Sequence, residues 1–125
     1  MVIDVRPDDR ISAEDAEVLA ATGRACDAAG WAYRRVGAVD PVMLANVRWL
    51  AGYRHHRFAH GERAELLSAA FATGRRLADG VDATGERLAL LPVLFHLLWS
   101  GVLVSDLARA PLGAVSIIGS GGRSA

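Results

Sequence analysis

Asp4 and Arg6 are the residues near the start of the chain whose types and spacing allow chemistry at a phosphate. Residues 2–6 predict a strand, so the side chains of Asp4 and Arg6 lie on the same face of it. A carboxylate can bind a hard divalent cation, and a guanidinium can hold a phosphate but stays protonated and cannot act as a base. Cation-assisted cleavage of a phosphodiester needs several carboxylates, and the alternative interpretation is an ion pair at the end of a strand.

A second candidate site is a basic region in the middle of the chain. Residues 1–30 carry a net charge of −4, residues 31–76 carry +5 and residues 77–125 carry −1. A basic region between acidic flanks can bind an anion, and phosphate contacts give affinity without reading a base sequence. The candidate DNA-binding residues are Arg34, Arg35, Arg48, Arg54, His55, His56 and Arg57. The alternative is a solvated face, and for the interleaved Trp31, Tyr33, Trp49 and Tyr53 we favour a place in the core.

The histidines and the cysteine offer little for a metal site. A structural zinc site needs four ligands, and His55, His56 and His60 with the single Cys26 supply them poorly. His96 lies in an apolar segment, where we expect a hydrogen-bonded core histidine. The sequence contains no phosphate-binding glycine loop, nucleophile elbow or CxxC pair.

The composition indicates a globular protein. Of its residues, 52% are apolar and 22% are charged. A length of 125 residues is enough for one domain or two small ones. The single cysteine and the lack of a secretory signal favour the cytoplasm. Residues 88–105 are very apolar, but Pro92, His96 and Gly101 interrupt them. We therefore predict a buried helix followed by a buried strand and no membrane association, with a membrane-anchored helical protein as the alternative.

A strand–helix–strand unit over residues 1–38 must position Asp4 and Arg6. Ser12 and Asp15 predict a capped helix start and Gly30 a helix end, and residues 31–36 predict a second strand. A crossover helix joins parallel strands. Two parallel strands bury too little surface, so we expect this unit to be the end of an α/β domain. We also expect its open edge to pair with a second copy or with another protein.

Residues 39–118 predict a mostly helical domain. Asp40 and Pro41 are typical of a helix start, and helices are predicted over residues 41–50, 62–73, 77–81 and 86–99. Residues 102–107 and 114–118 predict two strands around a turn. Three helices followed by such a hairpin is the order of a winged-helix-like domain, which binds DNA or protein. Residues 119–125 predict a disordered Gly/Ser tail, and the whole chain is predicted to be α+β.

Several strings of residues, spread over nearly the whole chain, together resemble the TnsA-like endonuclease subunits of heteromeric transposases, in their actinobacterial form. The segment from Asn46 to His55 is the most specific of them. The strings are Val5-Arg6-Pro7, Gly30-Trp31-Ala32-Tyr33-Arg34, Asp40-Pro41-Val42, Asn46-Val47-Arg48-Trp49-Leu50-Ala51-Gly52-Tyr53-Arg54-His55 and Leu91-Pro92-Val93-Leu94-Phe95-His96-Leu97-Leu98-Trp99.

The resemblance implies a restriction-endonuclease-like domain followed by a winged-helix-like domain. Such subunits cut DNA with Mg²⁺ at transposon ends, beside a separate transposase subunit and an ATPase regulator. In this chain the resemblance makes Asp4 and Arg6 the catalytic pair, with Asp4 as the metal ligand and Arg6 where nucleases of this fold commonly have Lys. The upstream acids of the site would precede Met1.

We therefore expect a chain that binds DNA or transposition partners and is not a complete nuclease. The alternative is a small winged-helix DNA-binding regulator or a protein-interaction module.

Overall fold

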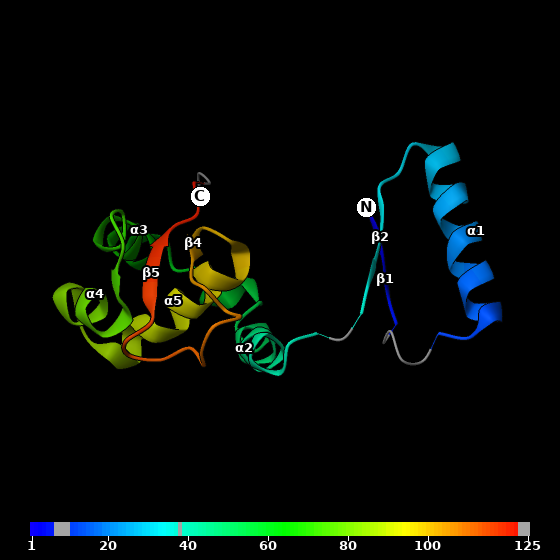
Figure 1. Ribbon diagram of the computed structural model, residues 1–125. Helices are drawn as coiled ribbons and strands as arrows, with labels where there is room; N and C mark the ends of the chain where they lie inside the picture. Colours follow the sequence, from blue (N-terminus) through cyan, green and yellow to red (C-terminus); the bar gives the residue numbers. More distant parts are fainter. Residues whose placement is uncertain (7–10, 38, 123–125) are drawn as a thin grey trace. The chain divides into compact units, whose positions relative to one another are not determined.

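The structure, a computed structural model, describes residues 1–6, 11–37 and 39–122. The chain divides into two compact units, Met1–Asp40 and Pro41–Ala125 (Figure 1). Helices and strands occur in both units, so the predicted α+β class is confirmed.

The first unit consists of strand β1 (Val2–Val5), helix α1 (Ala13–Ala29) and strand β2 (Tyr33–Val36). The Ser12 hydroxyl accepts a hydrogen bond from the Asp15 amide at 3.1 Å, and the Asp15 carboxylate accepts one from the Ser12 amide at 3.2 Å. Gly30 ends α1 with a φ of 75°, a left-handed conformation that favours glycine. β1 and β2 are parallel, with Val2 opposite Tyr33 and Val5 opposite Val36. The predicted caps and strand pairing are confirmed.

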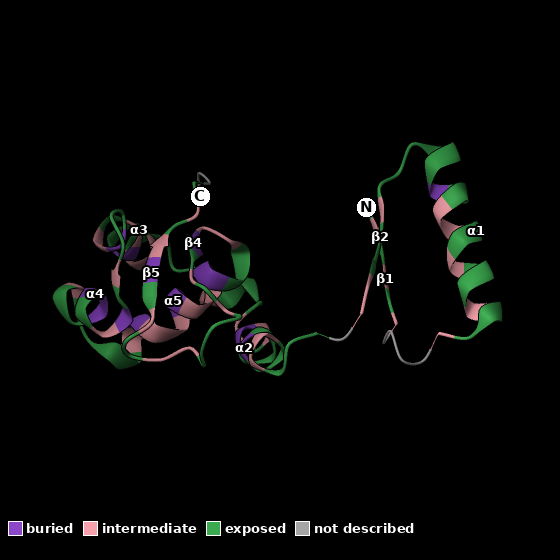
Figure 2. Ribbon diagram, in the orientation of Figure 1, coloured by how far each residue is buried: buried purple, intermediate pink, exposed green. Residues whose placement is uncertain are grey.

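Burial in the first unit is slight. β2 and α1 are in contact, and Tyr33 lies against Gly23 of the helix. Side chains alternate along β1, so Val2, Asp4 and Arg6 are partly buried, whereas Ile3 and Val5 are exposed on the other face. Cys26 is the one buried residue among those that the structure describes in this unit (Figure 2).

The second unit begins with three helical segments: α2 (Pro41–Ala51), the 3-10 helix η2 (His56–Phe58) and α3 (Gly61–Ala70). Strand β3 (Arg75–Arg76), helices α4 (Leu77–Thr84) and α5 (Arg87–Ser100), and strands β4 (Leu103–Val104) and β5 (Ile117–Ser120) follow. The strands form an antiparallel sheet in the order β3–β5–β4. The predicted helices are present, with shifted ends. Strand β3 was not predicted, because two residues carry no strand pattern of their own.

The predicted C-terminal hairpin and tail need correction. The two strands are shorter than predicted, and the second extends to Ser120, which lies opposite Leu103. The Gly121 amide also donates a hydrogen bond to the carbonyl of Val102 at 2.9 Å. The prediction of disorder from residue 119 was therefore wrong for Gly119 and Ser120, because pairing with β4 orders a Gly/Ser sequence that has no local preference for a strand. Residues 123–125 lie outside the described residues.

Helix α5 lies at the centre of the second unit and contacts α2, η2, α3, α4 and β4. The core around it is aliphatic apart from Phe71. It consists of Leu50, Leu67, Phe71, Leu77, Val81, Leu90, Val93, Leu94, Leu97, Leu98, Leu103 and Ile118. The apolar segment 88–105 is therefore mainly a core helix, with Pro92 inside it. Among the described residues, no helix is long and apolar enough to cross a membrane.

Candidate nucleic-acid interface

Residues 41–61 contain three arginines, three histidines and no acidic residue. They run through α2, a short loop and η2 in the second unit. Five of the predicted DNA-binding residues lie in this stretch, which we call the basic segment, and all five are exposed. They are Arg48, Arg54, His55, His56 and Arg57. These five side chains are therefore exposed within one short stretch of the chain.

Several interactions hold the loop of the basic segment in place. Arg54 Nη1 donates a hydrogen bond to the carbonyl of Ala51 at 2.6 Å. His55 Nδ1 accepts one from the Arg57 amide at 3.1 Å, which starts η2, and the rings of His55 and His56 stack 4.3 Å apart. The Arg57 guanidinium lies 4.8 Å above the ring of Phe58. Because a guanidinium has five N–H donors, both arginines keep donors for a phosphate while their positions are restricted.

A cluster of aromatic rings packs within and beside this loop. The Tyr53 ring lies 5.3 Å from Phe58, 5.0 Å from Phe95 of α5 and 5.7 Å from Trp49. His96 Nδ1 forms a 2.8 Å hydrogen bond with the carbonyl of Tyr53. This bond confirms the expectation of a hydrogen-bonded His96 and joins the loop to the central helix of the unit. The loop of the basic segment is therefore attached to the central helix of the second unit through Tyr53.

The expectation that the four interleaved aromatic residues lie in the core was wrong for the two tryptophans. Trp31 is 61% exposed and Trp49 is 54% exposed, whereas Tyr33 and Tyr53 are partly buried. Trp49 contacts the rings of Phe95 at 5.8 Å and Tyr53 at 5.7 Å, and about half of it is exposed to solvent. An exposed indole beside arginines can stack on a base or pack into a protein pocket.

Asn46 is a structural residue of this region whose role the sequence pattern did not reveal. It is 4% exposed, and its Nδ2 donates to the carbonyls of Leu107 at 2.8 Å and of Ala110 at 2.9 Å. Its Oδ1 accepts from the Leu112 amide at 2.9 Å. One side chain of α2 thereby fixes the loop between β4 and β5. The only available signal was a polar residue among the apolar residues of the predicted helix.

Arg34 and Arg35, the other two predicted DNA-binding residues, belong to β2 of the first unit. Arg35 lies opposite Asp4 in the parallel pair, and its Nη1 donates to the carbonyl of Arg6 at 3.3 Å. Arg34 lies opposite Ile3 on the other face. Both are exposed, but they are separate in the chain from the basic segment and lie in a different unit.

The candidate catalytic residues Asp4 and Arg6 both interact with neighbours inside the first unit. Asp4 Oδ2 accepts a hydrogen bond from the Tyr33 hydroxyl at 3.2 Å, and Arg6 Nη1 lies 3.3 Å from Asp15 Oδ2 of α1. Desolvation and then the bond to Asp4 raise the pKa of Tyr33. The hydrogen bonds from Ser12, with a smaller effect of Arg6, lower the pKa of Asp15. Both predicted catalytic side chains thus have structural partners.

A magnesium ion does not fit the donors at Asp4. Its carboxylate is engaged by Tyr33, and a hard cation bound by protein needs several oxygen ligands. Within the described part of the chain, no group of three or more His, Cys, Asp or Glu side chains is placed to hold a metal ion. The described residues alone therefore provide no catalytic step through a metal.

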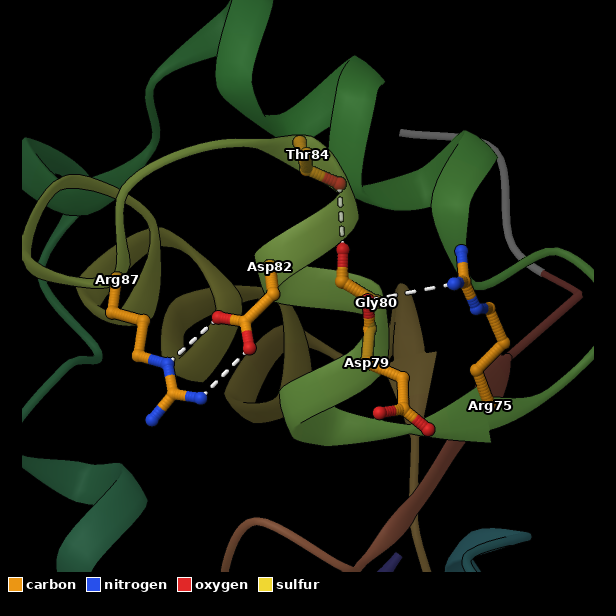
Figure 3. Close-up of polar contacts among 6 residues, drawn as sticks. All are labelled: Arg75, Asp79, Gly80, Asp82, Thr84 and Arg87. Atoms are coloured by element: carbon orange, nitrogen blue, oxygen red, sulfur yellow. Dashed lines mark hydrogen bonds and ion pairs between the residues drawn. The ribbon is translucent and has the colours of Figure 1, made fainter.

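Polar contacts stabilise α4 and the turn that joins it to α5 (Figure 3). Arg87, at the start of α5, binds Asp82 through two hydrogen bonds of 2.7 Å and 2.8 Å. These bonds lower the pKa of Asp82. The Thr84 hydroxyl donates to the carbonyl of Gly80 at 2.7 Å, and Arg75 donates to that of Asp79 at 3.4 Å. Arg87 is the single charged residue of α5, and its guanidinium is bound to Asp82.

Comparisons of the chain with protein-family models, with curated proteins and with solved structures found no match. A functional interpretation therefore depends on the geometry of the chain and on the resemblance of its sequence strings.

Proposed function

We propose that this chain is a DNA-binding and partner-docking component of a transposition machine, resembling the end of a TnsA-like endonuclease subunit. The proposal rests on the exposed basic segment, which lacks acidic residues and packs against a cluster of aromatic rings. Its partners would be DNA and, by resemblance, a transposase subunit and an ATPase regulator. The chain does not act as a complete nuclease.

The topology of the second unit supports a winged-helix-like domain. After α2 and η2, its order is α3, β3, α4, α5, β4 and β5, and the sheet order is β3–β5–β4. Three helices followed by a two-stranded hairpin is the order of a winged-helix domain, and α3, α4 and α5 followed by β4 and β5 have this order. The restriction-endonuclease-like assignment of the first unit has less support, because one helix and two parallel strands occur in many α/β folds.

The mode of DNA binding differs from that of a winged-helix protein that reads bases with its third helix. That helix is α5 here, and it is packed against five other elements. Its surface offers few side chains of the kind that read base edges, since Arg87 is bound to Asp82. We therefore propose that the basic segment contacts phosphates, which gives affinity without sequence selectivity.

The test is the affinity of the chain for duplex DNA at low ionic strength. Arg54→Ala and Arg57→Ala should each weaken binding several-fold, because each removes a phosphate contact. The matched control is Arg109→Ala, which removes an exposed arginine of the same unit outside the basic segment and should leave the affinity unchanged. Equal effects of all three substitutions would contradict a site at the basic segment.

A protein-interaction module is the second candidate function, and one observation favours it. A cavity of about 200 Å³ opens between α4, α5 and residues 112–114, and its lining is almost entirely apolar. It includes Leu77, Val81, Leu91, Phe95 and Leu112. Such a pocket fits an apolar side chain of a partner protein. No DNA binding at low salt would make this function the better account of the second unit.

A further inference from the structure

We propose that Trp49 stacks on an unpaired base of single-stranded DNA, while arginines of the basic segment hold the phosphates of the same strand. The proposal rests on the proposed function, since the basic segment must meet DNA, and it adds which form of DNA the exposed indole recognises. Three observations support it: the exposed but restrained position of Trp49, the row of ring contacts that leads from it to Arg57, and the charge of the surrounding segment.

Trp49 is exposed and at the same time held in place. It lies between Asn46 and Leu50, the buried residues of α2, and therefore borders the buried face of that helix. Its ring lies 5.8 Å from Phe95 at an interplanar angle of 84° and 5.7 Å from Tyr53 at 55°. Neither neighbour stacks parallel on the indole, and Trp49 is 54% exposed. A base can therefore stack on an indole whose position is already restricted.

A row of ring contacts connects Trp49 with a cation. Tyr53 contacts Trp49 on one side and the ring of Phe58, 5.3 Å away, on the other. The Arg57 guanidinium lies 4.8 Å from the centre of the Phe58 ring. Only the rings of Tyr53 and Phe58 thus separate the indole from a guanidinium, and Arg54 directly follows Tyr53 in the chain. The same short stretch of a strand can meet a stacking surface and a positive charge.

The charge of the segment favours a polyanion as the ligand. Residues 41–61 contain three arginines and no acidic residue, so nothing within the segment offsets their charge. Trp31 is also strongly exposed, but residues 1–30, which it follows, carry a net charge of −4. A nucleic acid strand presents planar bases and phosphates together, and this combination matches an exposed indole beside arginines.

Stacking on Trp49 requires a base whose face is free. In a duplex, both faces of an internal base are covered by neighbouring base pairs, and an aromatic ring could enter only by unstacking them, which costs free energy. The bases of a single strand offer their faces directly. Every base has such a face, so stacking adds affinity without reading a sequence. Trp49 should therefore contribute to the binding of a single strand and not to that of a duplex.

Binding of the full chain to two probes tests this difference. The probes are a thymine homopolymer of about 12 nucleotides and a relaxed circular duplex, which has no exposed terminal base. Trp49→Leu keeps an apolar side chain but removes the ring. It should weaken binding of the homopolymer about tenfold and binding of the duplex less than about twofold. The salt dependence should not change, because stacking releases no counterions. The control is Trp31→Leu, which removes an exposed tryptophan outside the basic segment and should change neither affinity.

Fluorescence reports stacking without removing Trp49. The chain has three tryptophans, so Trp49 is the only one left after Trp31→Phe and Trp99→Phe. The homopolymer should quench its emission, because a stacked base quenches an indole, and the circular duplex should quench it much less.

The outcomes separate this proposal from the DNA-binding proposal. Binding of both probes without quenching by the homopolymer would overturn stacking and leave phosphate recognition by the basic segment intact. Equal losses for both probes in Trp49→Leu would also overturn stacking, since the ring would then act only through the fold. No binding of either probe would overturn both proposals.

Discussion

At the scale of single residues, Asn46 shows how one buried side chain determines the position of a distant loop. Its amide makes three hydrogen bonds to Leu107, Ala110 and Leu112, which lie more than sixty residues further along the chain. Sequence reasoning could not find this role, because the partners are backbone groups in a loop without a motif. An unpaired buried backbone group is unfavourable, so the side chain stabilises both α2 and the loop.

Replacing Asn46 should therefore destabilise the second unit. Asn46→Ala leaves two carbonyls and one amide without their partner, and we expect a loss of about 2–4 kcal/mol in the free energy of unfolding. Urea unfolding followed by circular dichroism measures it. Leu44→Ala on the exposed part of the same helix is the control and should lose less than about 1 kcal/mol. Equal losses for the two substitutions would show that the three hydrogen bonds contribute little.

Gly80 of α4 is required for close packing. A Cβ atom at this position would overlap the ring of Phe71, which is fully buried. Gly80→Ala should destabilise the chain by about 1–3 kcal/mol in thermal or urea unfolding, despite the better helix propensity of alanine. Phe71→Leu combined with Gly80→Ala should lose less than the sum of the two single changes, because the smaller side chain makes room.

The control for Gly80 is Gly61→Ala at the start of α3, where an added Cβ meets no atom within 4 Å. It should leave stability unchanged or slightly raised. Additive losses for Phe71→Leu and Gly80→Ala would contradict the steric explanation.

At the scale of elements, the sequence predicted what depends on local chemistry. The Ser12–Asp15 capping box and the left-handed Gly30 lie where their residue types indicated. Strand β3 and the end of β5 were missed, because a two-residue strand and a Gly/Ser segment become strands only through their partners. The exposure of Trp49 was missed for a related reason: the apolar character of a side chain does not show whether a neighbouring element covers it.

The position of α5 leads to a prediction about DNA binding. Because α5 is enclosed by other elements and Arg87 is bound to Asp82, Arg87→Ala should leave the affinity for duplex DNA within about twofold of the original. The loss of a base contact in a groove-inserted helix would weaken binding at least tenfold at the preferred sequence. Binding measurements on several duplex sequences distinguish these results. A tenfold loss on one sequence alone would show that α5 reads bases.

At the scale of the whole molecule, the two units differ in how many of their residues are buried. The second unit has a continuous core around α5, whereas the first has one buried residue among those described. The resemblance suggested a catalytic pair in the first unit, but sequence alone could not show that Asp4 and Arg6 bind Tyr33 and Asp15. Such partners become visible only when α1 and β2 are placed beside β1.

The engagement of Asp4 and Arg6 leads to a prediction about catalysis. The purified chain should not cleave plasmid DNA with Mg²⁺ or Mn²⁺, because the described residues contain no group of three or more potential ligands to hold the cations that activate water. Agarose-gel assays of supercoiled plasmid measure nicking. Asp4→Ala separates a contaminating nuclease from the chain itself. Nicking that disappears in this variant would show that the site is completed in some other way.

The salt dependence of DNA binding tests the central claim most directly. If Arg48, Arg54 and Arg57 contact phosphates, the logarithm of the binding constant should fall linearly with the logarithm of the salt concentration. The slope should change by about 0.9 per contact. Arg54→Ala should reduce the magnitude of the slope by that amount, and Arg109→Ala should not. No binding at low salt, or a slope that Arg54→Ala leaves unchanged, would contradict phosphate recognition by the basic segment.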